Sequence, residues 1–203
     1  MIFWDFDGVI KESVSVKTNA YVGIFRQFGP GVAERVRRHH EANGGMSRFE
    51  KIPLYLEWAG QSANPDEIAK YCDVFASAVR QAVVDSSWVC GAREDLDANH
   101  RRQHFVLISA TPQQEMEQIL KELRIKPWFR EIHGAPTRKE DAIAGALGRW
   151  NCVAADALVV GDSRSDYSAA NKCGVEFLLR RTALNIELQR EFTGAQCEDF
   201  RNG

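Results

Sequence analysis

Two aspartates near the start of the chain, Asp5 and Asp7, stand two residues apart behind an apolar run and are followed by Gly8. In a β-strand, residues i and i+2 point to the same face, so both carboxylates would lie on one side of the chain. Two like charges held that close repel, and a cation or a shared proton is expected between them. One such carboxylate can act as a nucleophile and the other as a general acid and base. Taken alone, the pattern also fits a turn.

Three later segments place reactive side chains in the same way, where an apolar run ends or a helical pattern begins. They are the segment from Phe105 to Thr111 with Ser109, residues 132–139 with Lys139, and the segment from Leu158 to Asp166 with Asp162 and Asp166. Ligands of parallel α/β sheets bind beyond the carboxyl ends of the strands. The four segments therefore predict one shared site.

The elements that must position these residues alternate from about residue 92 onward. Strands are expected at 104–109, 131–133, 157–161 and 175–179, with helices at 93–102, 112–123, 138–150 and 165–173. A first strand is expected over residues 1–7, and helices over 14–28, 32–42, 47–58 and 64–84. Repeated strand–helix units predict an α/β fold with a parallel sheet covered by helices on both faces. We interpret residues 14–86 as an inserted helical cap and residues 1–13 and 87–203 as the core; the tail after Arg181 is polar and receives no element.

The four motifs, in this order, resemble those of the haloacid dehalogenase-like hydrolase superfamily, specifically its phosphoglycolate phosphatase and sugar-phosphate phosphatase branch. The resemblance covers nearly the whole chain and implies a Rossmann-like core with an inserted α-helical cap. It implies that Asp5 is the nucleophile that takes the phosphoryl group, and that Asp7 protonates the leaving oxygen and then activates water. Superfamily members that carry an aromatic residue, Ala or Thr at position 7 do other chemistry, so Asp7 favours a phosphatase or phosphomutase.

The same resemblance implies the remaining roles. The Ser109 hydroxyl and nearby backbone N–H groups, including that of Ala110, would bind the phosphate. Lys139 would neutralise the transition state and the charge of Asp5. The resemblance also implies Mg²⁺, which suits hard oxygen ligands. Its ligands would be the Asp5 carboxylate, the Asp7 carbonyl and Asp162, with Asp166 in or just behind that shell.

Structural roles compete with these assignments at three helix starts. Capping boxes are expected for Thr111 with Gln114, Thr137 with Glu140, and Ser163 with Asp166. Such helix starts also direct free N–H groups at the site and favour a phosphate there. A cation is unfavourable in the first turn of a helix, where Lys139 is expected. A bound phosphate would explain this position. Arg138 is its neighbouring competitor.

The sequence thus predicts a Mg²⁺-dependent phosphatase for a small phosphorylated metabolite. One alternative is a phosphomutase acting on a sugar phosphate, and another is a catalytically idle binding module. A cap that closes over a small substrate needs a polar group facing the core. Arg48, which follows the Gly44–Gly45 break, is the expected substrate contact, and Lys17 is the next candidate.

Composition excludes several other classes. The 203 residues carry 26 Lys and Arg against 28 Asp and Glu, a net charge of -2, so nucleic acid is not an expected partner. No apolar stretch approaches the length of a membrane span. The five cysteines are scattered and form no Cys-x-x-Cys pair, which favours reduced thiols in a cytoplasmic protein. The five histidines show no metal-ligand spacing.

Overall fold

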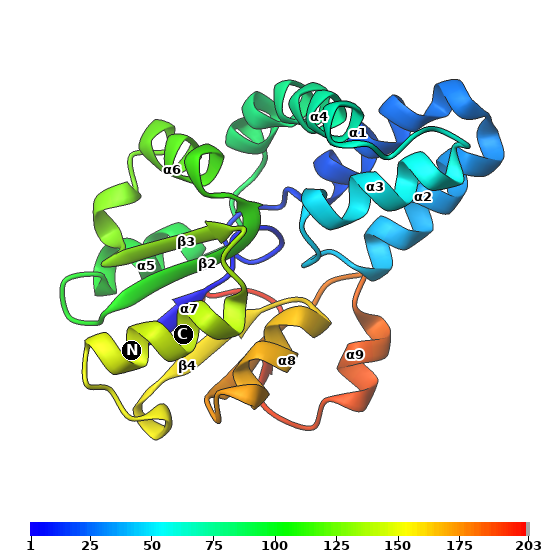
Figure 1. Ribbon diagram of the computed structural model, residues 1–203. Coiled ribbons are helices and arrows are strands. Elements are labelled where there is room, and N and C mark those ends of the chain that lie inside the picture. Colours follow the sequence, from blue (N-terminus) through cyan, green and yellow to red (C-terminus); the bar gives the residue numbers. More distant parts are fainter. Residues whose placement is uncertain (202–203) are drawn as a thin grey trace.

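The computed structural model describes residues 1–201, and its centre is a parallel sheet of six strands (Figure 1). The strands are β1 (Ile2–Trp4), β2 (Phe105–Pro112), β3 (Glu131–Ala135), β4 (Leu158–Gly161), β5 (Glu176–Arg180) and β6 (Gln196–Cys197), in the spatial order β3-β2-β1-β4-β5-β6. Every neighbouring pair runs parallel. The predicted α/β class is confirmed, and β1 lies between β2, which contains Ser109, and β4, which ends just before Asp162.

Helices cover both faces of this sheet. They are α5 (Ala92–Asn99), α6 (Gln113–Glu122), α7 (Lys139–Arg149), α8 (Arg164–Lys172) and α9 (Ile186–Glu191), with short 3₁₀ turns at Lys126–Trp128 and Ala154–Asp156. Successive residues of a strand point to opposite faces. Accordingly, Phe3 packs with residues of α7, α8 and α9, whereas Trp4 packs with residues of α5 and α6. Both side chains are buried, as expected for the centre of a two-sided sheet.

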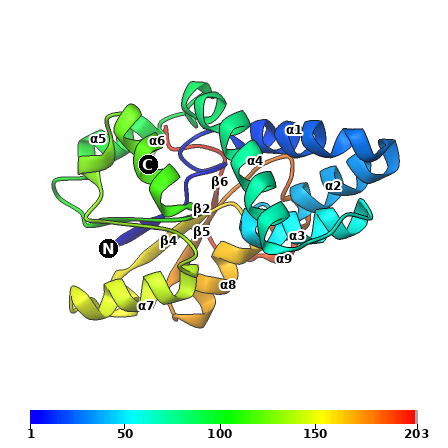
Figure 2. The same ribbon diagram turned by 45° about the horizontal axis from the view of Figure 1, so that its top comes forward.

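Four further helices gather beyond the carboxyl ends of the strands (Figures 1 and 2). They are α1 (Val14–Phe25), followed by a 3₁₀ turn at Arg26–Phe28, α2 (Pro30–Ala42), α3 (Arg48–Trp58) and α4 (Pro65–Asp85). Aromatic rings join them: Tyr21 stacks on Phe75 at 3.9 Å between ring centroids and meets Tyr55 edge to face at 5.4 Å. Their buried side chains form one continuous cluster with those on one face of the sheet. The division at residues 14 and 86 into cap and core stays a prediction.

Some expected boundaries were wrong. The first strand ends at Trp4 instead of residue 7, because the chain turns at Gly8, whose φ is +78° and whose N–H donates to the Lys11 carbonyl at 2.7 Å. The tail, to which no element was assigned, forms α9 and adds β6 to the edge of the sheet. These elements have six and two residues, too few for a periodic pattern to be seen.

Of the three expected capping boxes, only one forms. Ser163 and Asp166 cap α8 reciprocally. The box at Thr111 was wrong because β2 continues to Pro112, which is the N-cap of α6 without a side-chain bond. The box at Thr137 was also wrong, since Arg138 is the N-cap of α7 and likewise makes no capping bond.

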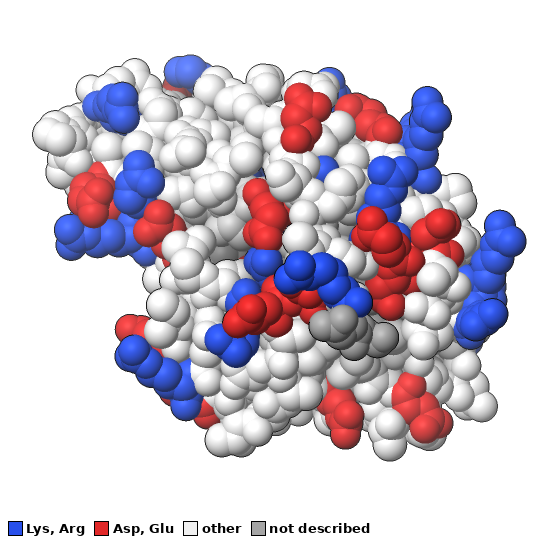
Figure 3. Space-filling view, turned by 180° about the vertical axis from the view of Figure 1, so that it is seen from behind, with Lys and Arg blue, Asp and Glu red and all other residues white. Residues whose placement is uncertain are grey.

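The surface agrees with the near-neutral charge. On the face shown in Figure 3, acidic and basic side chains are interspersed, with no broad basic area. All five cysteines are free thiols. Among residues 1–201, no helix is both long and apolar enough to cross a membrane.

Candidate active site

Asp5 lies at the centre of the site, directly after β1. Its N–H donates to the Val160 carbonyl at 3.0 Å, which ties the residue to the end of β4. The side chain is almost fully buried, and its Oδ1 accepts from the Lys139 ammonium at 2.8 Å. One carboxylate oxygen therefore has a cationic partner at a fixed distance, as a positioned nucleophile requires.

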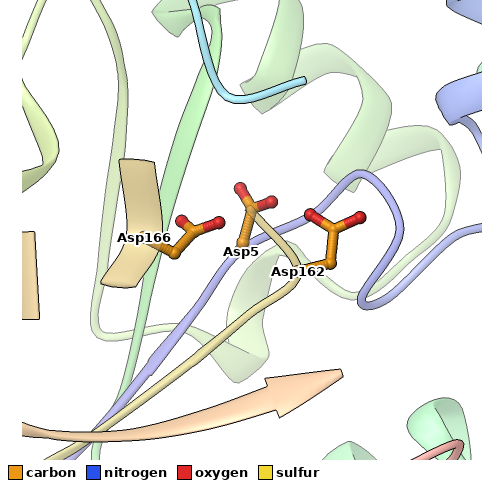
Figure 4. A group of neighbouring side chains, drawn as sticks. All are labelled: Asp5, Asp162 and Asp166. Atoms are coloured by element: carbon orange, nitrogen blue, oxygen red, sulfur yellow. The ribbon is translucent and has the colours of Figure 1, made fainter. Parts of the chain in front are cut away.

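Three carboxylates meet here (Figure 4). Asp5, Asp162 and Asp166 each offer an oxygen, and these oxygens lie within 4.8 Å of one another. Burial raises the pKa of Asp5 to about 7 against the opposing charge of Lys139, and Asp166 and Asp7 add to the rise. Burial, with the charges of Asp5 and Asp166, also raises the pKa of Asp162 well above its usual value. The cluster carries more negative charge than its own lysine offsets, so a hard cation fits it.

Two glycines permit this crowding. A Cβ on Gly8 would stand 2.1 Å from Oδ2 of Asp162, and a Cβ on Gly161 would stand 2.3 Å from the Cβ of Asp166. Both are closer than real side-chain atoms come. Gly8 and Gly161 are therefore required where the loops after β1 and β4 approach the carboxylates.

Lys139 lies in the first turn of α7, as predicted, and it bridges two carboxylates. Its Nζ lies 2.8 Å from Asp5 and 2.5 Å from Asp166. Burial alone would lower the pKa of Lys139, but Asp166 and Asp5 raise it above its usual value, so the ammonium stays charged. Arg138 is mostly exposed and pairs with Glu140. The structure thus brings Lys139, and not its competitor Arg138, to Asp5.

Both carboxylate oxygens of Asp166 accept hydrogen bonds from the protein. One of its oxygens accepts from Lys139, and the other accepts from the Ser163 hydroxyl at 2.6 Å and the Ser163 N–H at 3.1 Å. These bonds fix Lys139 beside Asp5 and place Asp166 behind the two carboxylates.

Asp7 faces a different set of partners. Its oxygens accept from the Ser13 hydroxyl at 2.5 Å and from the Lys17 ammonium at 2.5 Å, and the Thr111 hydroxyl lies 3.4 Å away. Burial would raise the pKa of Asp7, but the charge and hydrogen bond of Lys17 and the bond from Ser13 hold it below its usual value. The side chain is consequently ionised and turned toward α1, outside the cluster of three carboxylates.

A pocket of about 620 Å³ opens beside these residues. Ser109, Ala110 and Lys139 contribute to its lining from the core. The buried Ser109 hydroxyl accepts from the Thr111 N–H at 3.1 Å, so its own proton is free to donate into the pocket. The structure therefore brings the predicted phosphate-binding residues to the same cavity.

The family model described as "Haloacid dehalogenase-like hydrolase" matches residues 2–179. The chain belongs to this family. It is 27% identical over 184 residues to a phosphoglycolate phosphatase of Pseudomonas fluorescens, an alignment that covers 87% of this chain and 67% of that protein. The chain spans about two thirds of the length of the curated relatives it matches.

Solved structures of the family share the fold. CbbY of Rhodobacter sphaeroides in complex with xylulose-1,5-bisphosphate has a TM-score of 0.78 at 15% identity, covering 99% of this chain and 94% of that one. A β-phosphoglucomutase of Clostridium difficile has a TM-score of 0.75 at 15% identity, covering 98% of this chain and 90% of that one. The expected family and its phosphoglycolate phosphatase-like branch are confirmed. The family and its named relatives also support the predicted enzyme class, a phosphoric monoester hydrolase.

Sequence reasoning missed part of this hydrolase's site. The segment between α2 and α3, residues 43–47, lines the same pocket as Ser109 and Lys139. A Cβ on Gly45 would stand 1.8 Å from the Ser165 hydroxyl, so this loop lies directly on the start of α8. In the sequence, the glycine pair signalled only a helix break. Ser13 and Thr111 were also missed as partners of Asp7, because no spacing links residues of separate elements.

Arg48 lies elsewhere than expected for a substrate contact. Its guanidinium pairs with Glu115 at 2.6 Å and lies over the Phe75 ring at 4.7 Å from the centroid. With Glu115 it lines a separate hollow between α3, α4 and α6. Its role in binding substrate stays a prediction. Lys17, the second candidate, lies at Asp7 instead.

Proposed function

We propose that this chain is a Mg²⁺-dependent phosphatase that hydrolyses a small phosphorylated metabolite through an aspartyl-phosphate on Asp5. The observation that carries the proposal is the Asp5 carboxylate, held at 2.8 Å by Lys139 beside Asp162 and next to the pocket lined by Ser109. Phosphoryl transfer is catalysed mostly by positioning and charge neutralisation, and this arrangement offers both.

The residues divide the reaction between them. Asp5 attacks the phosphorus in line, the P–O bond to the alcohol breaks, and Asp7 protonates the departing oxygen. The Ser109 hydroxyl and the N–H of Ala110 hold the phosphoryl oxygens. Lys139 offsets the charge that develops on those oxygens. Water then cleaves the aspartyl-phosphate, which returns Asp5 and releases inorganic phosphate.

Mg²⁺ fits the carboxylate cluster by the chemistry of its oxygen donors, which the missing side chain of Gly8 allows to approach one another. The residues that would hold it are Asp5 and Asp162, with the Asp7 carbonyl, and Asp166 supports them through Lys139. When bound, the ion would offset the repulsion between carboxylates and the phosphoryl group.

Asp7 serves as the acid and base. Its ionised state, held by Lys17 and Ser13, suits the base that activates water in the second step. To act as an acid in the first step, the carboxyl must carry a proton against the charge of Lys17. The contact between Lys17 and Asp7 therefore favours the ionised Asp7 of the second step and disfavours the protonated Asp7 of the first.

A phosphomutase acting on a sugar phosphate is the second candidate. The fold shared with a β-phosphoglucomutase favours it, since the same aspartyl-phosphate chemistry would serve both. A requirement for a catalytic amount of sugar bisphosphate, with no net release of phosphate, distinguishes the mutase.

The pocket also bears on the substrate and the setting. Helices α1–α4, within residues 14–86, would form the cap. The 43–47 loop closes one side of the pocket, so a small substrate is favoured over a phosphoprotein. Free cysteines agree with the proposed cytoplasmic location.

The test is to trap the intermediate. Wild-type protein quenched in acid during turnover of a ³²P-labelled ester should carry label that hydroxylamine releases, as an acyl phosphate does. Asp5→Asn should carry none and keep under about one per cent of kcat, a barrier increase of about 2.7 kcal/mol. Asp97→Asn, on exposed α5, is the matched control and should label normally. Normal turnover by Asp5→Asn would refute covalent catalysis at this residue.

A further inference from the structure

Helix α3 contains a buried lysine that the proposed mechanism does not use. Lys51 is 1% exposed, and within residues 1–201 its ammonium has two hydrogen-bond partners, both neutral. These are Nδ1 of His40 at 2.9 Å and the Gly44 carbonyl at 3.5 Å. The Tyr21 ring lies 5.9 Å from the ammonium. Burying a charge with no carboxylate partner costs free energy, which makes a functional role the natural explanation for a lysine at this position.

His40 is arranged as the acceptor of this contact. Its ring is 3% exposed, and burial together with Lys51 holds its pKa well below the usual range, so the ring is neutral. When Nδ1 accepts from Lys51, the ring proton resides on Nε2. Nε2 is indeed the buried ring atom that has no hydrogen-bond partner within the described residues.

The hydrogen bond between Lys51 and His40 joins the two helices that flank the 43–47 loop. His40 is in the last turn of α2 on one side of the loop, and Lys51 lies in α3 on the other. The loop is otherwise a short turn, in which the Asn43 N–H donates to the His40 carbonyl and the Met46 N–H donates to the Asn43 carbonyl. Lys51 therefore ties both flanking helices and the Gly44 carbonyl together.

The loop held in this way lines the pocket to which Ser109 and Lys139 also contribute. Gly45 of this loop rests on Ser163 and Ser165 at the start of α8, next in the chain to Asp162 and Asp166. A shift of the loop would widen the pocket without touching the carboxylates.

We propose that Lys51 is a positioning residue: through His40 and Gly44 it fixes the 43–47 loop as the substrate-facing wall, and the wall loosens when Lys51 loses its proton. An ammonium makes charge-assisted bonds that are roughly twice as strong as those of a neutral amine. The consequence for substrate binding rests on the proposed function, whereas the coupling between Lys51 and the loop does not.

The Lys51 ammonium loses its proton near neutral pH. Burial, with the charge of Lys17, lowers the pKa of Lys51 to about 7, while Asp7 and Glu50 act in the opposite direction. The facing groups are Lys17 and Tyr21 on α1, His39 and His40 on α2, and Asp7 after β1. Below about pH 7 the ammonium holds the loop, and above it the contact weakens.

The loop can be observed directly, without substrate. The chain has three methionines, of which Met46 lies in the loop and Met116 is buried in α6. In protein labelled with ¹³C-methyl methionine, we expect the Met46 signal to titrate near pH 7 and the Met116 signal to stay constant. In Lys51→Arg, which stays charged, the Met46 titration should vanish. A Met46 signal that is constant in the wild type, or that titrates equally in the variant, overturns the proposal.

Kinetics test the consequence for binding. Lys51→Met should raise KM for a small phosphate ester about tenfold near pH 6 and less than threefold near pH 8.5, with kcat changed little, because wild type itself loses the contact at high pH. The ratio of variant to wild type cancels titration of the substrate. Lys70→Met, an exposed lysine of α4, is the control and should leave KM unchanged. A ratio independent of pH, or a loss confined to kcat, refutes the role.

The Met46 titration and the kinetic comparison together distinguish a wrong role for Lys51 from a wrong proposed function. If Lys51→Met does not fold, Lys51→Arg takes its place, and the ratio of its KM to that of the wild type should fall as the pH rises through about 7, because only the wild type loses the contact. Absence of phosphatase activity in the wild type would contradict the proposed function and leave the Met46 titration as a valid test of the loop.

Discussion

Replacing Gly8 by alanine should disable the site while costing the fold little. The new Cβ would stand 2.1 Å from Oδ2 of Asp162, and real contacts stay above 3.0 Å, so the carboxylate or the loop must move by at least 3.0 − 2.1 = 0.9 Å. Displacing a catalytic group by about 1 Å costs about 100-fold in rate. The residue also has φ +78°, and a side chain in that region costs about 1–2 kcal/mol of stability.

Gly174→Ala separates the two effects. Gly174 has φ +66° and nothing within 4 Å of its would-be Cβ, so alanine there carries the same backbone strain in the exposed turn after α8 without contacting the site. Both variants should lose similar amounts in Tm. Only Gly8→Ala should lose about 100-fold in kcat/KM and need more Mg²⁺ for half-maximal activity, because Asp162 is displaced.

Steady-state assays with a chromogenic phosphate ester across a Mg²⁺ series, combined with thermal unfolding, measure all of these quantities. If Gly8→Ala keeps activity within about threefold of Gly174→Ala, the close approach to Asp162 does not matter for catalysis, and the assignment of Asp162 to the metal fails with it.

Three further outcomes follow from the same geometry. In Lys17→Met the pKa of Asp7 should rise, because the charge that lowers it is gone. The limb of the pH profile of kcat that Asp7 controls should therefore move to higher pH, and an unmoved limb would contradict this. Asp7→Asn should slow an alkyl phosphate far more than a nitrophenyl phosphate, whose leaving group needs little protonation, and equal losses would remove Asp7 from the acid role. Chelation should abolish activity and Mg²⁺ restore it, with Ca²⁺ restoring it poorly because Ca²⁺ takes more ligands at longer distances; full activity in excess chelator would refute the metal.

The order of the motifs allowed the fold and most of the site to be predicted. Parallel strands end at one edge of the sheet, so residues that follow successive strands converge there whatever their separation in the chain. This is why Asp5, Ser109, Lys139 and Asp162 could be placed together from the sequence. The unfavourable position of Lys139 in a first helical turn was a second useful signal, and its carboxylate partners account for it.

Side-chain partners between separate elements were beyond the same reasoning. Thr111 illustrates the difficulty: its spacing to Gln114 fits a capping box, yet β2 extends past it and its hydroxyl accepts from Lys17 at 2.8 Å. A local pattern cannot register that α1 brings a lysine to this point. The contact of Lys51 with His40 was invisible for the same reason, since a lysine in a helical pattern is ordinarily expected in solvent.

Arg48 shows how a correct local argument can leave the partner undetermined. The glycine break and helix start place it at the head of α3, as expected, but the helix turns its guanidinium toward Glu115 of α6. Arg48 is nearly buried, and its carboxylate partner Glu115 and the Phe75 ring beneath it hold it in place on one side of α3. The 43–47 loop contacts the start of α8 elsewhere. Arg48 and Lys51 therefore hold α3 from two directions, and we expect the loop between α2 and α3 to be the part that faces the substrate.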